Sequence, residues 1–155
     1  MLRIGLTSDT HGLLRPEAVQ FLRGCGQIVH AGDIGDSAVL DALREIAPVT
    51  AVCGNNDAGE WALTIPETQT LRIGGVALFV LHDLKELPAH RVPADVQVVV
   101  CGHSHKPQIT RDPAGLLVIN PGSAGPRRFK LPVSAAELVI ADDGSFRPQL
   151  VSLFH

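Results

Sequence analysis

Histidine, aspartate and asparagine side chains recur in this 155-residue sequence at spacings that suit metal binding. Asp9 and His11 are separated by one residue, and so are His103 and His105. Alternate residues of an extended chain share a face, so each pair could bind neighbouring ions. Mixed ligation by carboxylate, imidazole and amide groups favours a pair of divalent transition-metal ions over calcium or a thiolate zinc site.

The same residue types stand at the ends of five apolar runs that are typical of β-strands. The runs cover residues 2–8, 27–30, 49–53, 76–81 and 96–101. They lead, in that order, into Asp9-Thr10-His11, Ala31-Gly32-Asp33, Gly54-Asn55-Asn56-Asp57, His82-Asp83 and Gly102-His103-Ser104-His105. Ligands of open α/β sheets bind at the carboxyl ends of the strands. The sequence therefore predicts a metal site at that edge of a sheet.

The order of the elements indicates an α/β fold. In the first half, strands over 2–7, 27–30 and 49–53 alternate with helices over 16–23 and 36–46, which predicts a largely parallel sheet. In the second half, hairpins are predicted for 68–73 with 76–82, 108–111 with 116–120 and 137–141 with 146–153, around a buried strand over 96–101. We expect one domain over 1–155, in which the two halves of the chain form the two sheets of one sandwich, with helices outside.

Composition excludes several classes of function. The sequence has 13 basic and 16 acidic side chains and a net charge of −3. It therefore lacks the excess of basic residues that is typical of nucleic-acid-binding proteins. The longest apolar stretch, residues 73–81, is about half the ~18 residues that suggest a membrane span. The start of the sequence lacks a signal-peptide pattern, and its three cysteines lack a C-x-x-C spacing. These features predict a cytoplasmic protein.

The ordered motifs resemble those of the calcineurin-like metallophosphoesterases, in particular their small single-domain bacterial and archaeal phosphodiesterases. The motifs are Asp9-x-His11, Gly32-Asp33, Gly54-Asn55-x-Asp57, His82, Gly102-His103-x-His105 and Asn120-Pro121-Gly122-Ser123. The resemblance spans roughly residues 4–123 and implies a four-layer α/β/β/α sandwich of two mixed sheets flanked by helices. It also implies a binuclear site at the strand ends.

The resemblance assigns a role to each candidate ligand. The first ion would be held by Asp9, His11, Asp33 and His105, and the second by Asp33, Asn55, His82 and His103, with Asp33 bridging. Manganese is the expected metal, with iron, zinc or nickel as alternatives. A hydroxide bridging the ions would hydrolyse a small phosphodiester, and Asn55, Asp33 and His103 would carry catalysis.

Two positions depart from the resemblance. Many family members have histidine at the position of Asn56, where it is thought to protonate or stabilise the leaving group. Asparagine cannot act as an acid near pH 7, so the substrate needs a good leaving group or another proton source. Asp83 stands where the family commonly has glycine, and it could either orient His82 or cap the segment that follows.

Other residues have two readings from the sequence. Asn56, Arg127 and Arg128 are expected to contact the substrate, although exposed arginines on a loop often bind nothing specific. His30 could support a ligand or only pack within its strand. Trp61 could lie at a pocket rim or in the core.

Competing functions follow from the same family resemblance. A protein-binding scaffold of this fold, like a retromer subunit, would be expected to have lost ligands, whereas every ligand position here is filled. A phosphomonoesterase or a nuclease would keep the metals, but the charge balance disfavours a nuclease. A homo-oligomer is compatible with the sequence.

Overall fold

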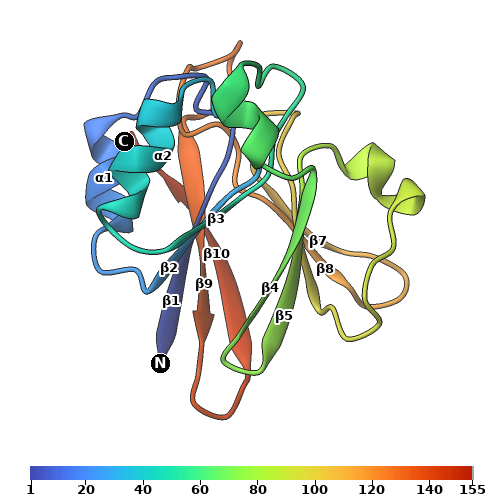
Figure 1. Cartoon of the computed structure of the whole chain (residues 1–155). Helices are drawn as coiled ribbons and strands as arrows, with labels where there is room; N and C mark the ends of the chain where they lie inside the picture. The colour runs from blue at the N-terminus through green and yellow to red at the C-terminus, as the bar shows by residue number, and fades with distance from the viewer. Residues whose placement is uncertain (155) are drawn as a thin grey trace.

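The computed structural model describes residues 1–154 and contains two five-stranded mixed sheets (Figure 1). The first sheet has the order β10-β9-β1-β2-β3 and the second has the order β4-β5-β6-β8-β7. The strands of the first sheet are β1 (Leu2–Thr7), β2 (Gln27–His30), β3 (Val49–Ala51), β9 (Ser134–Ile140) and β10 (Phe146–Ser152). Those of the second are β4 (Thr68–Ile73), β5 (Val76–Leu81), β6 (Val98–Val100), β7 (Gln108–Arg111) and β8 (Leu117–Asn120).

The centre of each sheet is parallel and its margins are antiparallel. In the first sheet, β1, β2 and β3 run parallel, β9 pairs antiparallel with β1, and β10 pairs antiparallel with β9. Since β9 and β10 come from the second half of the chain, the expectation that each half forms one sheet is wrong. In the second sheet, β5, β6 and β8 run parallel, and β4 and β7 pair antiparallel at its edges. Parallel strands end at one edge of their sheet, so the residues that follow β1, β2, β5 and β6 can meet there.

The main apolar core lies between the two sheets. Alternate residues of β1, such as Ile4 and Leu6, pack against residues of β5 and β6, such as Leu78 and Val98, and all four are fully buried. This two-residue period places the neighbouring side chains of each strand on the opposite face of its sheet. The core therefore fixes how the two sheets, and with them the two sets of strand ends, face each other.

Helices cover the outer face of the first sheet. These are α1 (Pro16–Leu22) and α2 (Ser37–Arg44), both of which lie on one side of the molecule in Figure 1. Pro16 occupies the first turn of α1, and the Asp36 side chain accepts a hydrogen bond from the Ala38 backbone N–H to cap α2. Both helices end slightly before the predicted bounds, since α1 stops at Leu22 and α2 at Arg44.

The outer face of the second sheet is covered differently. Its helical layer is a short 3₁₀-helix, η2 (Leu84–Ala89). A second 3₁₀-helix, η1 (Glu60–Thr64), follows β3 and places Trp61 against the core beneath α1 and α2. The predicted α/β fold with two mixed sheets is confirmed, and its fourth layer is thin.

Strand bounds differ from prediction mainly where polar loops begin. β3 ends at Ala51 rather than at residue 53, and β6 covers only Val98–Val100 of the predicted 96–101. Within residues 1–154, no helix has both the length and the apolar character that a membrane span requires.

Candidate metal centre

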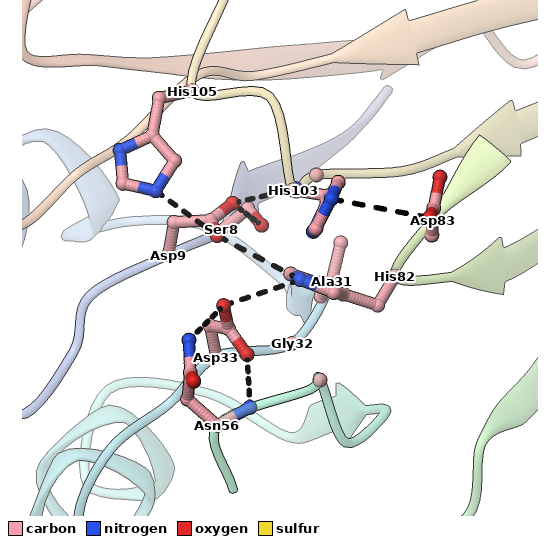
Figure 2. Close-up of polar contacts among 12 residues, drawn as sticks. Ser8, Asp9, Ala31, Gly32, Asp33, Asn56, His82, Asp83, His103 and His105 are labelled. Atoms are coloured by element: carbon pink, nitrogen blue, oxygen red, sulfur yellow. Dashed lines mark hydrogen bonds and ion pairs between the residues drawn. The ribbon is translucent and has the colours of Figure 1, made fainter. Parts of the chain in front are cut away.

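Four strand ends bring the predicted ligands together in space. Asp9 and His11 follow β1, Asp33 follows β2, His82 follows β5, and the segment with His103 and His105 follows β6. Figure 2 shows the Asp9, Asp33 and His82 side chains converging, with His105 and His103 above them. Residues 94 positions apart, His11 and His105, have their Nε2 atoms 3.3 Å from each other.

Two groups of three side chains have the spacing of a metal site. The first is Asp9, His11 and His105, and the second is Asp9, Asp33 and His82, with the donor atoms of each group within 4.8 Å of one another. The Oδ1 atom of Asp9 lies 3.7 Å from His11 Nε2, 3.4 Å from His105 Nε2 and 3.9 Å from His82 Nε2. Asp9 thus belongs to both groups.

Asp33, a member of the second group, also approaches the first group. Its Oδ2 atom is 3.3 Å from His82 Nε2 and 3.7 Å from His11 Nε2. A carboxylate in this position can offer an oxygen to each of two neighbouring ions. The arrangement fits the bridging role that the family resemblance implies for Asp33.

Unpaired polar atoms support a metal at this place. Asp9 Oδ1 and His82 Nε2 are buried and have no hydrogen-bond partner among the described residues. Buried polar atoms are normally paired, because an unpaired one costs about 1–3 kcal/mol. A carboxylate oxygen and imidazole nitrogens directed at one point are the donor set that a divalent transition metal prefers. The residues present therefore fit the metal that the fold implies.

The hydrogen bonds of His82 select the tautomer that binds a metal. Its Nδ1 lies 2.7 Å from the Ala31 carbonyl oxygen, so Nδ1 donates and Nε2 keeps its lone pair toward Asp33 and Asp9. A backbone carbonyl behind a ligating histidine is a common way to fix the orientation of its ring.

The carboxylates are also held from behind. Asp9 Oδ2 accepts hydrogen bonds from the Ser8 hydroxyl and from the His103 backbone N–H, which leaves Oδ1 facing the histidines. Asp33 accepts two bonds from Asn56, at 3.0 Å from the backbone N–H to Oδ1 and at 3.1 Å from the side-chain amide to Oδ2. Both carboxylates are therefore oriented before any ligand arrives.

The backbone around the ligands adopts a conformation that L-residues rarely take. Positive φ angles occur at six non-glycine residues of the described chain, and five of these are candidate ligands: Asp9, His11, Asp33, His103 and His105. Such backbone conformations cost free energy, and residues that adopt them are concentrated at functional sites. The left-handed turns direct the side chains inward as soon as the strands end.

The protonation of the cluster follows from its mixed charges. Burial alone raises the pKa of Asp33 and of Asp9, but the neighbouring histidines and hydrogen-bond donors outweigh it and lower both pKa values. Burial also lowers the pKa of His82, but Asp33, Asp9 and the Ala31 carbonyl outweigh it and raise that pKa. Both carboxylates are thus ionised near neutral pH and ready to bind a cation.

Two predicted ligands of the second ion stand at the edge of the cluster. The His103 side chain is 44% exposed, and its ring centroid lies 5.2 Å from that of His82 in an edge-on arrangement. Asn55 is exposed and lines a cavity beside the centre together with Gly54 and His82. Their roles as ligands remain predictions from the family resemblance.

The predicted substrate contacts are arranged differently. Asn56 donates to the Asp33 carboxylate, so its amide supports a candidate ligand. Arg127 and Arg128 are exposed, and Arg127 lines a separate cavity with Pro132 and Phe154. The described contacts do not bring either arginine to the metal centre.

The structure distinguishes between the two roles predicted for Asp83 and between the two predicted for His30. Asp83 caps η2 by accepting from the Lys85 backbone N–H, and its Oδ2 lies 3.9 Å from His103 Nε2 rather than behind His82. His30 is fully buried and bonds to Thr10 Oγ1 and to the Gly32 backbone N–H. His30 thus ties together the two loops that carry Asp9 and Asp33.

Sequence reasoning missed the residues that hold the ligands from behind. The hydroxyls of Ser8 and Thr10 bond to Asp9 and to His30, and the Ser123 hydroxyl donates to the Asp9 carbonyl. Ser8 and Thr10 flank Asp9 in the sequence, but nothing in their spacing indicates which atoms they contact. Asp57 accepts hydrogen bonds from the Gly54 and Gly35 backbone N–H groups and so holds its turn together.

The chain is similar to known metallophosphoesterases. The model of the calcineurin-like phosphoesterase superfamily domain matches residues 2–143. A probable metallophosphoesterase of Methanocaldococcus jannaschii is 35% identical over 133 residues, which cover 77% of this chain and 67% of that protein. Another, from Methanothermobacter thermautotrophicus, is 32% identical over 132 residues, which cover 77% of this chain and 76% of that protein.

Solved structures show the same fold at lower identity. An archaeal phosphodiesterase has a TM-score of 0.76 at 22% identity and covers 97% of this chain and all of its own. Vps29 of Entamoeba histolytica, solved in complex with Zn²⁺, has a TM-score of 0.73 at 23% identity, with 98% of this chain and 99% of that chain covered. With the family model matched over most of its length and the metal-type residues gathered at the strand ends, this chain belongs to the calcineurin-like phosphoesterase superfamily.

Proposed function

We propose that this protein is a phosphodiesterase that works with two divalent transition-metal ions, preferably manganese. The observation that carries the proposal is the convergence of Asp9, Asp33, His11, His82 and His105, with Asp9 Oδ1 and His82 Nε2 buried and unpaired. Unpaired buried atoms destabilise a protein unless a ligand pairs with them, so this arrangement supports metal binding. The archaeal phosphodiesterase of the same fold supports the choice of reaction.

Two groups of donor atoms support the assignment of two ions. Asp9, His11 and His105 form the first group, and Asp9, Asp33 and His82 form the second. The Asp33 carboxylate, near both His11 and His82, would hold both ions. His103 and Asn55 would complete the ligands of the second ion from the exposed side of the cluster.

The residues of the chain prepare the site for a phosphate anion. Asp9 and Asp33 supply two negative charges, so a pair of divalent ions leaves a formal surplus of two positive charges. The ions, when bound, polarise phosphoryl oxygens and lower the pKa of water so that it can attack phosphorus. Exposed His103 and Asn55 stand where the substrate must enter, and Asn55 orients the phosphate with its amide.

Leaving-group chemistry limits the substrate. Asn56 carries no titratable proton, and its amide is engaged with Asp33. Diesters whose leaving group is a weak base, such as aryl esters, need no acid at this position. We therefore expect faster hydrolysis of aryl diesters than of alkyl esters.

The test is a metal-dependence assay on the full chain. The protein is stripped with a chelator and reloaded with manganese, nickel, zinc or magnesium. Hydrolysis of an aryl phosphodiester and of its monoester is then measured, alongside Asp33→Ala and His103→Ala variants. We expect manganese to restore diester cleavage in the wild type and neither variant to turn over. A chain that binds the metals without turnover would instead indicate a scaffold, and a fully active Asp33→Ala variant would contradict the ligand assignment.

A cytoplasmic location and a small substrate are part of the same proposal. Cys25, Cys53 and Cys101 are all free thiols, as suits a reducing compartment. The net charge of −3 favours a small phosphate ester over a nucleic acid.

A further inference from the structure

A cavity of about 330 Å³ adjoins the metal centre on the outer face of the second sheet. Its wall includes Gly102, His103 and Ser104, which follow β6, together with residues of β7, β8 and the start of η2. His103 belongs to both the cavity wall and the ligand-bearing loop. The cavity is therefore reached from the place where a phosphate would bind.

The cavity exists because η2 covers only part of the second sheet. Leu87 of η2 packs over the outer residues Phe79 and Val99, whereas the outer faces of β7 and β8 have no helix above them. Register places Gln108 opposite Asn120 and Thr110 opposite Val118, and all four line the cavity. The open end of this sheet face lies at the same edge as the metal ligands.

The lining suits an uncharged organic group of moderate size. Cys101 and Val118 are buried apolar side chains at its base, and exposed Gln108 and Thr110 form a polar side. The Asn120 amide is already used, since it donates to the Gly102 carbonyl and the Ser104 hydroxyl. No arginine is among the lining residues. The cavity therefore lacks a guanidinium group, which could bind a second phosphate through two parallel hydrogen bonds.

A carboxylate stands between this cavity and the metal centre. Asp83 lines the cavity and also lies next to His82 in the chain. Its Oδ2 is 3.9 Å from His103 Nε2. Figure 2 marks this contact with a dashed line. Its Oδ1 is held by the Lys85 backbone N–H at 3.1 Å, so the side chain is fixed in place. Exposed Lys85 is the one lysine of the wall, and no described contact joins its ammonium to His103.

We propose that this cavity holds one ester group of a phosphodiester and that Asp83 at its mouth selects against substrates with a second negative charge. The inference rests on the proposed function and deepens it. A diester carries one negative charge near neutral pH, and a monoester carries close to two. Only the diester has a second organic group to fill the cavity, so shape and charge select the same substrate class.

The size of the charge effect can be bounded. One additional unit charge several ångströms from a partly buried carboxylate is disfavoured by on the order of tenfold in binding, and the effect weakens as salt rises. Asp83→Asn removes this repulsion but keeps a side chain that can cap η2. The structural role and the selective role of Asp83 are thereby separated.

The first experiment compares manganese-loaded wild type with Asp83→Asn. We expect the monoester-to-diester ratio of kcat/KM to rise on the order of tenfold in the variant and inorganic phosphate to bind more tightly by calorimetry. The control is Asp41→Asn, which makes the same charge change on the exposed side of α2 and should leave both values unchanged. Titration of each metal-free variant with manganese alone shows whether the centre is intact.

The second experiment fills the cavity. Thr110→Trp places a large side chain on the cavity side of the edge strand β7, and we expect KM for a bis-aryl phosphodiester to rise on the order of tenfold. Binding of inorganic phosphate, which has no ester group, should not change. Gln149→Trp is the matched control, because Gln149 is also exposed and lies on β10, the edge strand of the other sheet.

The outcomes separate this inference from the proposed function. Absence of diester turnover by the manganese-loaded wild type overturns the proposed function and this inference with it. Diester turnover with an unchanged ratio in Asp83→Asn, or with an unchanged KM in Thr110→Trp, overturns only the inference. A monoester activity that falls in Lys85→Met while Asp83→Asn has no effect would show that the cavity selects for the second charge.

Discussion

At the scale of single residues, the candidate ligands depend on neighbours that hold their orientation. Asn56 is the clearest case, because both of its donors bond to the Asp33 carboxylate. The family often has histidine at this position, so its replacement by asparagine exchanges an acid for a hydrogen-bond donor. We therefore expect Asn56 to affect metal binding through Asp33.

Removal of the Asn56 side chain should weaken metal binding. Asn56→Ala keeps the backbone bond to Oδ1 and loses the amide bond to Oδ2, and such supports are typically worth 10–100-fold in metal affinity. We expect a loss of about tenfold in manganese affinity by isothermal titration calorimetry. Unchanged affinity with altered diester KM would instead assign Asn56 to substrate binding, as the sequence suggested.

His30 makes folding sensitive to pH. The Gly32 N–H points to its Nδ1, so the ring is neutral and its Nε2–H donates to Thr10 Oγ1, whose own hydroxyl donates to the Ile34 carbonyl. Burial lowers the pKa of His30 to about 4 from its ordinary 6.5, against the opposing pull of Asp9. Between about pH 6.5 and pH 4, His30 is therefore mostly protonated in the unfolded chain and mostly neutral in the native state.

Stability should therefore fall as pH decreases from about 6.5 to 4. The shift corresponds to about 3 kcal/mol over the whole window, at 1.36 kcal/mol per pKa unit. In urea unfolding with chelator present, the loss between pH 7 and pH 4.5 should be smaller in His30→Gln than in the wild type. An equal loss in both proteins would assign the pH dependence to the other histidines.

At the scale of elements, the loop after β6 can approach β1 only because Gly102 has no side chain. A Cβ atom at this position would overlap the Ser8 hydroxyl and crowd the Asp9 carboxylate. The same close approach lets the His103 backbone N–H bond to Asp9 Oδ2. The absence of a side chain at Gly102 thus allows the two sheets to come into contact at the candidate metal centre.

Gly102→Ala should separate these strand ends. We expect a destabilisation of about 2 kcal/mol or more from overpacking and a loss of tight manganese binding. Gly26→Ala is the control, because its added Cβ would meet nothing closer than the Arg3 carbonyl at 3.9 Å. Urea unfolding and metal titration measure the two effects, and equal results for both variants would refute the role given to Gly102.

At the scale of the whole molecule, the core between the sheets holds the two halves of the centre in register. Leu78 of β5 is fully buried in this core. Leu78→Ala should cost about 2–5 kcal/mol in the free energy of unfolding. Leu63→Ala, at a side chain that is 85% exposed, should cost less than about 0.5 kcal/mol. Chemical denaturation distinguishes them, and a cost below about 1 kcal/mol for Leu78→Ala would show that the sheets are held mainly elsewhere.

The sequence by itself determined the elements and the chemistry of the site. Strand periodicity is a local property, so β1, β2, β5 and both helices of the first half were predictable to within a few residues. The placement of Asp9, Asp33 and His82 after apolar runs was equally local. The parallel order of those runs then predicted a shared edge, and the donor types predicted a divalent transition metal.

Only the tertiary structure decided which atoms meet. Asn56 turns to Asp33, Asp83 approaches His103, and Arg127 lies in a separate cavity. These contacts depend on loop paths, left-handed backbone turns and the packing of residues far apart in the chain, which leave no periodic signal in a single sequence. The cavity beside His103 is the same kind of feature, because it exists only where the short η2 fails to cover the second sheet.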